Sequence, residues 1–455
     1  MSVCLSCTRR KYWRNLVALG SIISRFIGEQ RAAVIYNLKR IFINRARFLV
    51  KRGSLGFSPA LTSNACKFLA KKGYHTFFGY YDLSPLDAED TKCLATLVAG
   101  GNTVPSTDSI AKVGYYDLSG KTDRFIELGQ TSLWCWQQSC RLQWYPTQDQ
   151  ATDNILYNTL TDKGGQSVIQ NFRTRAVVRE FRRPIYATTH DGRYGFSLDF
   201  ARLHRLRPGY GYAALEEFSP NKLCPNDNGI WRIDLHSGEE VLLFTIADVA
   251  AIQPLTGMSG ADHYFNHILV NPSGTRLLFF HLQTQGKKKS GRLLTANLDG
   301  SQINVVVNSG HASHYCWDGN DQIICYSTIP ERGTHIYRYQ DQSGEAEVLL
   351  SQYVDRDCHM SLSPVSRTLL IDSYPDQHRL QALALCDLTQ PNREDIAFFY
   401  MPASYSGELR CDLHPRFNAD GSKISVDCVY RGHRAICILS LEPQASVKKQ
   451  EAITT

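Results

Sequence analysis

Three observations on the sequence predict an all-β protein built from repeated sheets. Tyrosine, phenylalanine and tryptophan are plentiful, at 23, 20 and 6 residues, and aromatic side chains favour strands. A turn of the form Pro/Asp-x-Gly followed by a short strand-like run recurs down the chain. A second hairpin follows these units, which makes four strands per repeat. Such units must stack around a ring, so we predict a seven-bladed β-propeller with a short basic N-terminal helical extension.

The repeated runs are spread through the chain, and each predicts the start of one blade. They begin at Ser84, Tyr145, Thr189, Asn271, Trp317, Ser363 and Asn418. Clear examples of the second hairpin are the stretches 113–128, 229–245 and 335–350, each of which turns at a polar Ser-Gly step. The longest gap, 202–262, predicts loops over one end of the ring. A strand from near residues 66–80 is expected to complete the last blade.

The domain boundary is expected near residue 55, which separates an extension (1–55) from the propeller (56–455). Twelve lysines and arginines lie in the first 52 residues, against the single acid Glu29. This composition predicts a basic amphipathic helix, either lying on an anionic membrane or a partner, or packed on the domain as a solvated helix. The remainder is close to neutral, so no nucleic-acid partner is expected. Helical periodicity is absent after residue 55, which disfavours an α-solenoid.

Cysteine usage and hydropathy bear on the cellular compartment. The 14 cysteines are scattered, many of them inside predicted strands, which favours buried reduced thiols over a disulfide framework. No run of about 18 uncharged apolar residues occurs, so no transmembrane helix is predicted. The apolar segment 16–27 is interrupted by Arg25 and lacks a cleavage site, so no signal peptide is predicted. We expect a cytoplasmic protein, or one peripheral to the inner membrane face through its basic segment.

Ionisable residues gather just before the repeated turns, where the innermost strands of a propeller face the central channel. Five of the seven predicted blades offer a histidine there: His75, His267 (with His263 nearby), His314, His359 and His414. A single such histidine is most simply explained by bonds to backbone groups. Recurrence in one layer favours a functional cluster, since converging imidazoles and carboxylates are costly unless paired or metal-bound.

Several stretches resemble the oligogalacturonate lyases, which are seven-bladed propeller enzymes that cleave acidic polysaccharide by β-elimination with a divalent metal. These stretches are FNHILVNPSGTRLLFFH, SHYCW, DCHMSLSP and CDLHPRFNADGSKISVDC, within residues 189–441. The N-terminal stretches GYYDLSP and WCWQQ look more like uncharacterised bacterial propellers that accompany polysaccharide metabolism. The resemblance implies a polysaccharide lyase acting on an acidic, uronate-containing polysaccharide or oligosaccharide, such as a bacterial exo- or capsular polysaccharide.

The resemblance also implies a divalent metal, manganese or calcium. His314 and His414 match metal ligands of the family. In the family's Gln-x-x-His-x-His-Pro run, Leu409 replaces the glutamine and Asp412 replaces the first histidine. Aspartate binds Mn²⁺ or Ca²⁺, whereas leucine cannot bind a metal, so His359 is the candidate for the missing ligand. The predicted metal site is therefore His314, His359, Asp412 and His414.

Chemistry supports the same residue types. Elimination removes a proton α to a carboxylate, so it needs a base near that proton and a cation beside the carboxylate. His267, which matches the family's catalytic histidine, or His263 is the candidate base, and a tyrosine could protonate the leaving oxygen. The predicted catalytic residues are His267, His263, Arg202 and Tyr81. The predicted substrate-binding residues are His75, Tyr80, Arg205, Tyr210, Arg410 and Arg416.

The surroundings of His267 lead to further expectations. It precedes the run ILVNP, whose alternation would place Ile268 and Val270 on one face and His267 and Leu269 on the other. We therefore expect His267 to start an innermost strand. Neighbouring positive charge is expected to lower its pKa and keep it neutral near pH 7.

Two other functions remain open on the sequence. One is a non-catalytic propeller that binds glycan or protein in a polysaccharide assembly, favoured by Leu409 and by the basic N-terminal segment. The other is a glycoside hydrolase on the same scaffold. Three tryptophans, Trp134, Trp136 and Trp144, are better explained by blade packing than by stacking on sugars.

Overall fold

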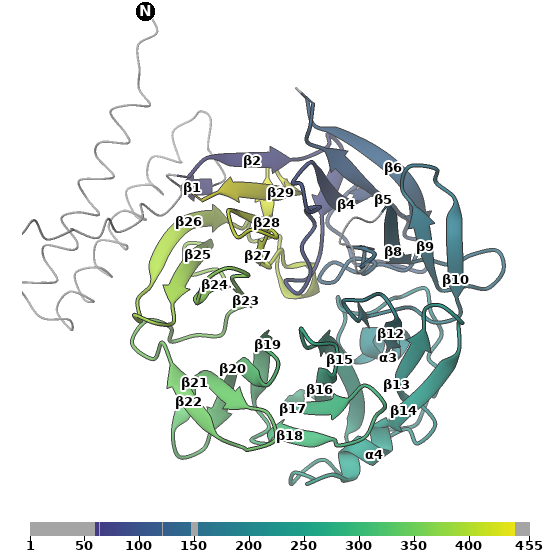
Figure 1. Cartoon of the computed structure of the whole chain (residues 1–455), viewed down its shortest axis with the longest axis vertical. Helices are drawn as coiled ribbons and strands as arrows, with labels where there is room; N and C mark the ends of the chain where they lie inside the picture. Colours follow the sequence, from purple (N-terminus) through teal and green to yellow (C-terminus); the bar gives the residue numbers. More distant parts are fainter. Residues whose placement is uncertain (1–59, 63, 121, 147–152, 442–455) are drawn as a thin grey trace, which may run out of the picture.

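The computed structural model describes residues 60–62, 64–120, 122–146 and 153–441, and these form a ring of seven antiparallel sheets (Figure 1). The predicted seven-bladed β-propeller is confirmed. The predicted N-terminal helix lies outside the described residues. No helix of the described part is long and apolar enough to span a membrane.

Blades 1 to 4 follow one another in chain order, each with its first strand innermost. Blade 1 contains β3 (Tyr74–Phe77), β4 (Lys92–Ala99), β5 (Ala111–Asp117) and β6 (Arg124–Thr131). Blade 2 contains β7 (Gln143–Trp144), β8 (Asn154–Asn158), β9 (Ser167–Asn171) and β10 (Val177–Phe181). Blade 3 contains β11 (Ala187–Thr188), β12 (Tyr194–Ser197), β13 (Gly229–Asp234) and β14 (Glu240–Thr245). Blade 4 contains β15 (Asp262–Val270), β16 (Arg276–Gln285), β17 (Lys288–Asn297) and β18 (Asn304–Val307).

Blades 5 to 7 complete the ring, and blades 6 and 7 each include a strand from the start of the described chain. Blade 5 contains β19 (Ala312–Asp318), β20 (Gln322–Ile329), β21 (Gly333–Gln340) and β22 (Ala346–Leu349). Blade 6 contains β23 (Met360–Leu362), β24 (Thr368–Asp372), β25 (Leu380–Asp387) and β26 (Glu394–Tyr400), with β1 (Ala60–Thr62) outside them. Blade 7 contains β27 (Arg416–Phe417), β28 (Lys423–Tyr430), β29 (His433–Ser440) and β2 (Cys66–Leu69).

Two strands from the start of the described chain join the last two blades, and only one of them was predicted. Strand β2 pairs antiparallel with β29, with Phe68 opposite Cys437, so an early strand completes the last blade as expected. Strand β1 pairs with β26 and adds a fifth strand to blade 6, which the repeat pattern did not predict. Figure 1 shows both N-terminal strands beside the yellow-green strands of the chain's end.

The repeated turns join the first and second strands of the blades. In blade 4, the Asn271 side chain accepts hydrogen bonds from the backbone N–H groups of Thr275 and Arg276, at 2.8 and 2.9 Å. Gly274 in this turn has φ +66°, a conformation that glycine adopts without a steric penalty. Because each turn sends the chain outward again, the residues that precede it lie on the innermost strand.

The long gap between the third and fourth repeats is more regular than predicted. Besides the hairpin β13–β14, which the sequence predicted, it contains two short helices, α3 (Phe200–Leu206) and α4 (Ile246–Ala251). Asp199 caps α3 by accepting a bond from the Arg202 N–H at 2.9 Å. The loops predicted for this segment therefore include two short helices that the sequence did not predict.

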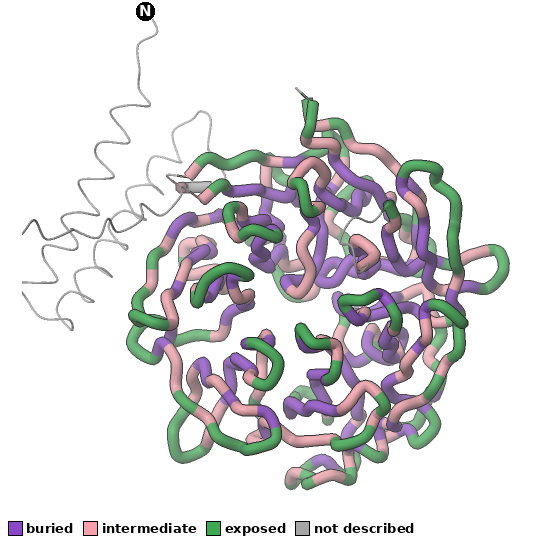
Figure 2. Tube along the Cα trace, viewed as in Figure 1, coloured by how far each residue is buried: buried purple, intermediate pink, exposed green. Residues whose placement is uncertain are grey.

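The core lies between the blades, and the outer strands and loops carry most of the exposed residues (Figure 2). Trp134 and Trp136 are buried and donate their indole N–H groups to the carbonyls of Ser109 and Thr103, at 2.8 and 2.7 Å. These tryptophans are thus packed into the blades. Every described cysteine is a free thiol, and most are buried.

Candidate functional site

Four histidines lie on or beside the innermost strands of blades 4 to 7. His267 is within β15, His314 is within β19, His359 precedes β23, and His414 lies two residues before β27. All four are buried. The ring centroids of His314 and His359 are 4.0 Å apart, and those of His359 and His414 are 4.4 Å apart. The blade repeat therefore brings together histidines separated by nearly 150 positions in the chain.

A compact group able to hold a metal forms within this cluster. One ligand atom each from His359, Asp412 and His414 lies within 4.8 Å of the others, and all three residues are buried. The Nε2 atoms of His359 and His414 have no hydrogen-bond partner among the described residues. A buried imidazole nitrogen without a partner is costly, so a cation that accepts its lone pair fits this position. We refer to His359, Asp412 and His414 as the metal triad.

Asp372, at the end of β24, orients His359. Its carboxylate lies 2.9 Å from Nδ1 of His359, and it also accepts the His359 backbone N–H at 2.9 Å. A carboxylate accepts from Nδ1–H, so the lone pair of His359 is on Nε2. Burial alone would lower the pKa of His359, but the carboxylates of Asp372, Asp412 and Asp357 together outweigh burial, and the pKa is raised. Sequence reasoning missed Asp372, which comes from the second strand of the blade.

Asp412 is held by Arg410 two residues earlier. The guanidinium makes bonds of 2.7 and 2.9 Å from Nε and of 2.7 Å from Nη2 to the carboxylate. Burial would raise the pKa of Asp412, but Arg410 outweighs burial and lowers it, so the group stays ionised. Arg410 therefore supports a triad residue, although one edge of its side chain remains partly exposed.

His314 lies beside the triad but has a different polar partner. Its Nδ1 is 2.9 Å from Asp357, whose other oxygen accepts the Ser313 hydroxyl at 2.7 Å. Burial would raise the pKa of Asp357, but His314 and Ser313 bring it to about 2. Of the four predicted metal ligands, three meet in the triad, and His314 packs against the ring of one of them.

His267 occupies a bulge inside β15. The pairing with β16 shifts register between Asn266 and Leu269, and His267 has φ +49°. The expected alternation through Leu269 is therefore wrong, and the residue lies within the strand and not at its beginning. A non-glycine residue with positive φ is costly and often marks a functional position. The backbone carbonyl of His267 accepts the hydroxyl of Tyr315.

The hydrogen bonds around His267 favour one tautomer of its ring. The Tyr81 hydroxyl donates to the Tyr315 carbonyl at 3.1 Å and accepts from the Tyr315 N–H at 3.1 Å. When the hydroxyl proton is donated to this carbonyl, the hydroxyl is an acceptor toward Nδ1 of His267, 3.4 Å away. This arrangement favours the tautomer of His267 with the proton on Nδ1, and Nε2 has no hydrogen-bond partner within the described structure.

Burial is the main cause of the low pKa of His267, which is about 3. Asp82 opposes this shift, while Arg141, His314 and His359 add to it. The expectation of a neutral imidazole is met, but desolvation contributes more than neighbouring charge. Asp82 and Arg141 form a fully buried ion pair at 2.7 Å close to this histidine.

Two tyrosines cover the cluster. The Tyr80 ring contacts His267, His414 and His359, with centroid distances of 4.7, 5.0 and 6.1 Å. Tyr210 packs edge-on against Tyr80 at 6.2 Å. Both tyrosines are buried. Tyr80 thus fills the space between His267 and the metal triad.

The other predicted arginines make ion pairs away from the triad. Arg202 binds Glu217 at 2.5 Å and the carbonyls of His263 and Leu223, which ties α3 to blade 4. Arg205 shares Glu217 at 2.6 Å and also bonds to Asp262. 

Arg416 has a similar tethering position. It bonds to Asp427 at 3.0 Å and to the carbonyls of Gly79 and Tyr80, so it anchors the segment that carries Tyr80 and Tyr81. 

Two predicted histidines lie outside the cluster. His263 bonds to His281 at 2.9 Å, and His281 in turn accepts from Arg292 at 2.8 Å. His75 accepts the Arg434 N–H at 3.0 Å and contacts Trp136, between blades 7 and 1. The structure does not bring either residue to the triad.

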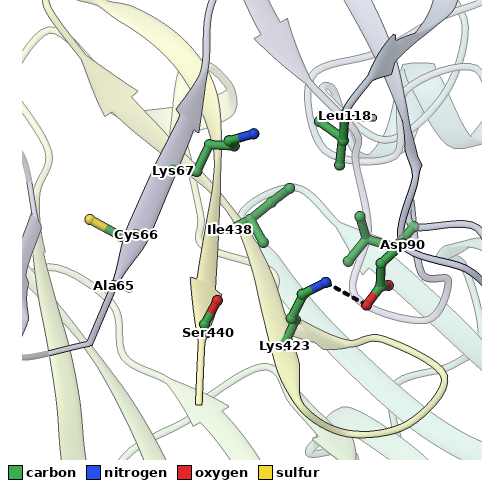
Figure 3. A pocket seen from close by; sticks show the side chains of 9 residues that line it. Ala65, Cys66, Lys67, Asp90, Leu118, Lys423, Ile438 and Ser440 are labelled. Atoms are coloured by element: carbon green, nitrogen blue, oxygen red, sulfur yellow. Dashed lines mark hydrogen bonds and ion pairs between the residues drawn. The ribbon is translucent and has the colours of Figure 1, made fainter. Parts of the chain in front are cut away.

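Surface cavities also lie apart from the cluster. One, of about 270 Å³, opens between blades 7 and 1 and is lined by Lys67, Lys423 and Asp90 (Figure 3). Lys423 and Asp90 form an ion pair of 2.7 Å across its floor. Another is lined by Met258, Pro254 and His263. Neither includes a triad residue.

Comparison with known proteins supports the fold. No protein-family model matches the chain, and no curated protein matches its sequence. Its structure is similar to that of an oligogalacturonate lyase in complex with manganese, with a TM-score of 0.58 and 14% identity over 84% of this chain and 94% of that one. An oligogalacturonate lyase from Vibrio parahaemolyticus gives a TM-score of 0.54 and 12% identity over 84% and 98%. The chain is thus a seven-bladed propeller that resembles those lyases in fold, with a buried triad that could bind a metal.

Proposed function

We propose that this protein is a metal-assisted lyase that cleaves uronate-containing oligosaccharide or polysaccharide by β-elimination. The observation that carries the proposal is the set of unpartnered imidazole Nε2 atoms around Tyr80. His267 contributes one of them, and His359 and His414 contribute the others. A proton acceptor and a cation site in one buried cluster are what elimination α to a carboxylate requires.

His267 would act as the base. Its Nδ1–H is directed to Tyr81, so Nε2 accepts the α-proton without a change of tautomer. Burial keeps the imidazole neutral at pH 7. Tyr80 lies between this nitrogen and the triad, so a sugar ring that reaches both must displace Tyr80.

His359, Asp412 and His414 would hold a divalent cation, with manganese or calcium as candidates because imidazole and carboxylate suit the former and carboxylate the latter. A bound cation would supply positive charge to the carboxylate of the substrate as the α-carbon loses its proton. Arg410 keeps Asp412 ionised for this purpose, and Asp372 fixes the ring of His359.

The direct experiment is a search for turnover. Pectic oligomers and bacterial exopolysaccharides are incubated with the protein, with and without Mn²⁺ or Ca²⁺, while ultraviolet absorbance reports an unsaturated product. We expect product with a uronate-containing glycan and at least a roughly 100-fold loss of rate in H267Q, because the base is removed. H311N, which alters an exposed histidine of blade 5, is the control.

Two outcomes would redirect the proposal. New reducing ends without unsaturation would identify a hydrolase. An absence of product with every uronate-containing glycan, with and without metal, would refute a lyase. H267Q should melt within a few degrees of the wild type, so a loss of activity can be separated from unfolding.

A second candidate function is a non-catalytic propeller that binds glycan or protein and is stabilised by a metal. It is favoured by the burial of the triad under Tyr80 and Tyr210. In that case Mn²⁺ would raise the melting temperature and glycan would bind without turnover. H267Q would then leave glycan binding unchanged.

A further inference from the structure

Arg207 differs from the arginines that the sequence singled out. Arg202, Arg205, Arg410 and Arg416 each form an ion pair with an aspartate or glutamate of the chain. Arg207, the C-terminal cap residue of α3, has no carboxylate within 4.0 Å among the described residues. It is partly buried, so its charge is only partly solvated. A half-buried guanidinium without an anion leaves room for an anion from outside the chain.

The guanidinium of Arg207 lies beside the candidate site. It is positioned over the Tyr210 ring, 4.4 Å from the centroid. Tyr210 in turn contacts Tyr80, and Tyr80 contacts His414 of the metal triad. Arg207 is therefore separated from the triad by two tyrosine rings. This geometry suits a group that binds the sugar next to the one at the triad.

No contact within the described chain neutralises the positive charge of the Arg207 guanidinium. A cation at a helix C-terminus gains a modest electrostatic stabilisation, and stacking on Tyr210 adds a similar amount. Burial raises the pKa of the Tyr264 hydroxyl, and the adjacent Arg207 guanidinium opposes the shift. The guanidinium also hydrogen-bonds to the hydroxyls of Tyr210 and Tyr264, but these neighbours are a partial dipole and neutral tyrosines, and none of them is an anion. Glu408 of the facing loop lies beside Gly209, where a Cβ on that glycine would come within 3.3 Å of it, but Glu408 forms no ion pair with Arg207 among the described residues.

We propose that Arg207 forms a carboxylate-binding subsite at the rim of the cluster, which receives the acidic group of a uronate adjacent to the unit that is cleaved. This inference deepens the proposed function and rests on it for the identity of the sugar. Every unit of a uronate oligomer carries a carboxylate, and a guanidinium binds carboxylate through two parallel N–H···O bonds. Arg207 would then make the protein prefer oligomers over single uronic acids.

Titration calorimetry with two forms of one probe tests this subsite. The probes are trigalacturonate and its fully methyl-esterified form, which has the same sugars without the charge. Wild type should bind the acid form at least about tenfold more tightly than the ester. R207M should lose about tenfold for the acid form and nothing for the ester. R193M is the control, because Arg193 is an exposed arginine of blade 3 that also stacks on a tyrosine, Tyr194, at 5.0 Å.

The outcomes separate this inference from the proposed function. Equal affinity of R207M and wild type for the acid form would overturn the subsite, as would a wild type that fails to distinguish acid from ester or binds neither. Tight binding that depends on Arg207, without unsaturated product under any condition, would refute the lyase and leave the subsite standing. R207K keeps the charge but loses the paired donors, so it should recover only part of the affinity for the acid form.

Discussion

At the scale of single residues, the partner of one ring nitrogen decides what the other can do. Tyr81 directs the His267 proton to Nδ1, and Asp372 does the same for His359. Both residues therefore present a bare Nε2 to the buried cluster. His314 also has a carboxylate at Nδ1, from Asp357. The cluster is thus composed of neutral or paired imidazoles whose orientation comes from groups outside it.

Replacing Asp372 tests whether the carboxylate behind His359 supports a metal. D372N should lower the affinity for Mn²⁺ by about 10- to 100-fold, because the histidine loses its orientation and basicity. Metal titration calorimetry of the chelator-treated protein measures this. D387N, which alters an aspartate at the end of β25 in the same blade, should bind Mn²⁺ as the wild type does. Equal affinity in the two variants would mean that the triad does not bind the metal.

The sequence located the histidines better than it located their partners. His314, His359 and His414 recur at one position of the repeat, so the repeat alone predicted that they would meet. Salt-bridge partners follow no such rule. Arg202 and Arg205 both find Glu217 in the segment after α3, and Arg416 finds Asp427 on the adjacent strand. Arginines could therefore be listed from the sequence, but the sequence could not show that Arg207 would form no ion pair with an acid of the described residues.

At the scale of elements, blade 4 contains a row of buried side chains, each of which donates a hydrogen bond to the next. Arg292 on β17 donates to Nδ1 of His281 on β16 at 2.8 Å, so His281 carries its proton on Nε2. That nitrogen is 2.9 Å from Nδ1 of His263 on β15, and Nε2 of His263 reaches the Met258 carbonyl at 3.0 Å. Both histidines are therefore neutral in the folded protein, and they fasten the loop that follows α4 to the blade.

The neutral histidines of this hydrogen-bonded row predict that the free energy of unfolding decreases in acid. Burial lowers the pKa of His281 well below its usual value, with Arg292 adding to the shift, and burial likewise lowers that of His263. At a pH below about 6.5 but above the pKa values of His263 and His281 in the folded protein, these histidines are protonated in the unfolded chain and neutral in the folded one. The stabilisation is complete above about pH 6.5 and is lost as the pH falls below it.

Urea unfolding at pH 7.5 and pH 5.5 measures this effect. H281Q should reduce the free energy of unfolding at pH 7.5. It should also make that free energy depend less on pH, because one histidine that is protonated only in the unfolded state is removed. H236N, which alters an exposed histidine of blade 3, should keep the wild-type slope. If H281Q and wild type lost stability in parallel between the two pH values, the acid response would have to arise elsewhere.

The bulge in β15 is an element that the hydrophobic pattern of the sequence could not predict. Alternation of apolar residues predicted the strand itself, which spans Asp262–Val270. It could not predict that His267 would adopt φ +49°, because a bulge depends on pairing with β16 and on the Tyr315 hydroxyl of the next blade. The position of His267 in its strand was for this reason misjudged.

At the scale of the whole molecule, the repeat predicted the ring, and the ring determined the site. Seven turns gave seven blades, and the innermost strands converge because each turn lies at the same place in its blade. The helices α3 and α4 escaped prediction because both occur in an insertion that the repeat does not describe. Strand β1 escaped it because a three-residue edge strand has no pattern of its own.

Closure of the ring depends on β2, and a core substitution there tests how much it contributes. Leu69 is 1% exposed and packs with blade 1 residues such as Phe77, so L69A should lower the free energy of unfolding by about 2–5 kcal/mol. Chemical denaturation provides the measurement. The control K67A, also on β2, removes only a partly exposed ion pair with Asp123 of blade 1 and should cost less than about 1 kcal/mol. Equal effects would mean that β2 is not a tightly packed part of the ring.

The two early strands also give the molecule a direction of mechanical weakness. Among the described residues, β1 pairs on one side only, with β26, and β2 pairs on one side only, with β29, whereas each middle strand pairs on both sides. Tension applied from the N-terminal side would therefore peel β1 from blade 6, then β2 from blade 7, one pair of hydrogen bonds after another. Tension from the opposite end meets β29 in the interior of its sheet and must shear several pairs together. Pulling each end in turn against a fixed point on a middle blade should therefore record a low, stepwise force for the N-terminal route and a higher, single rupture for the C-terminal route.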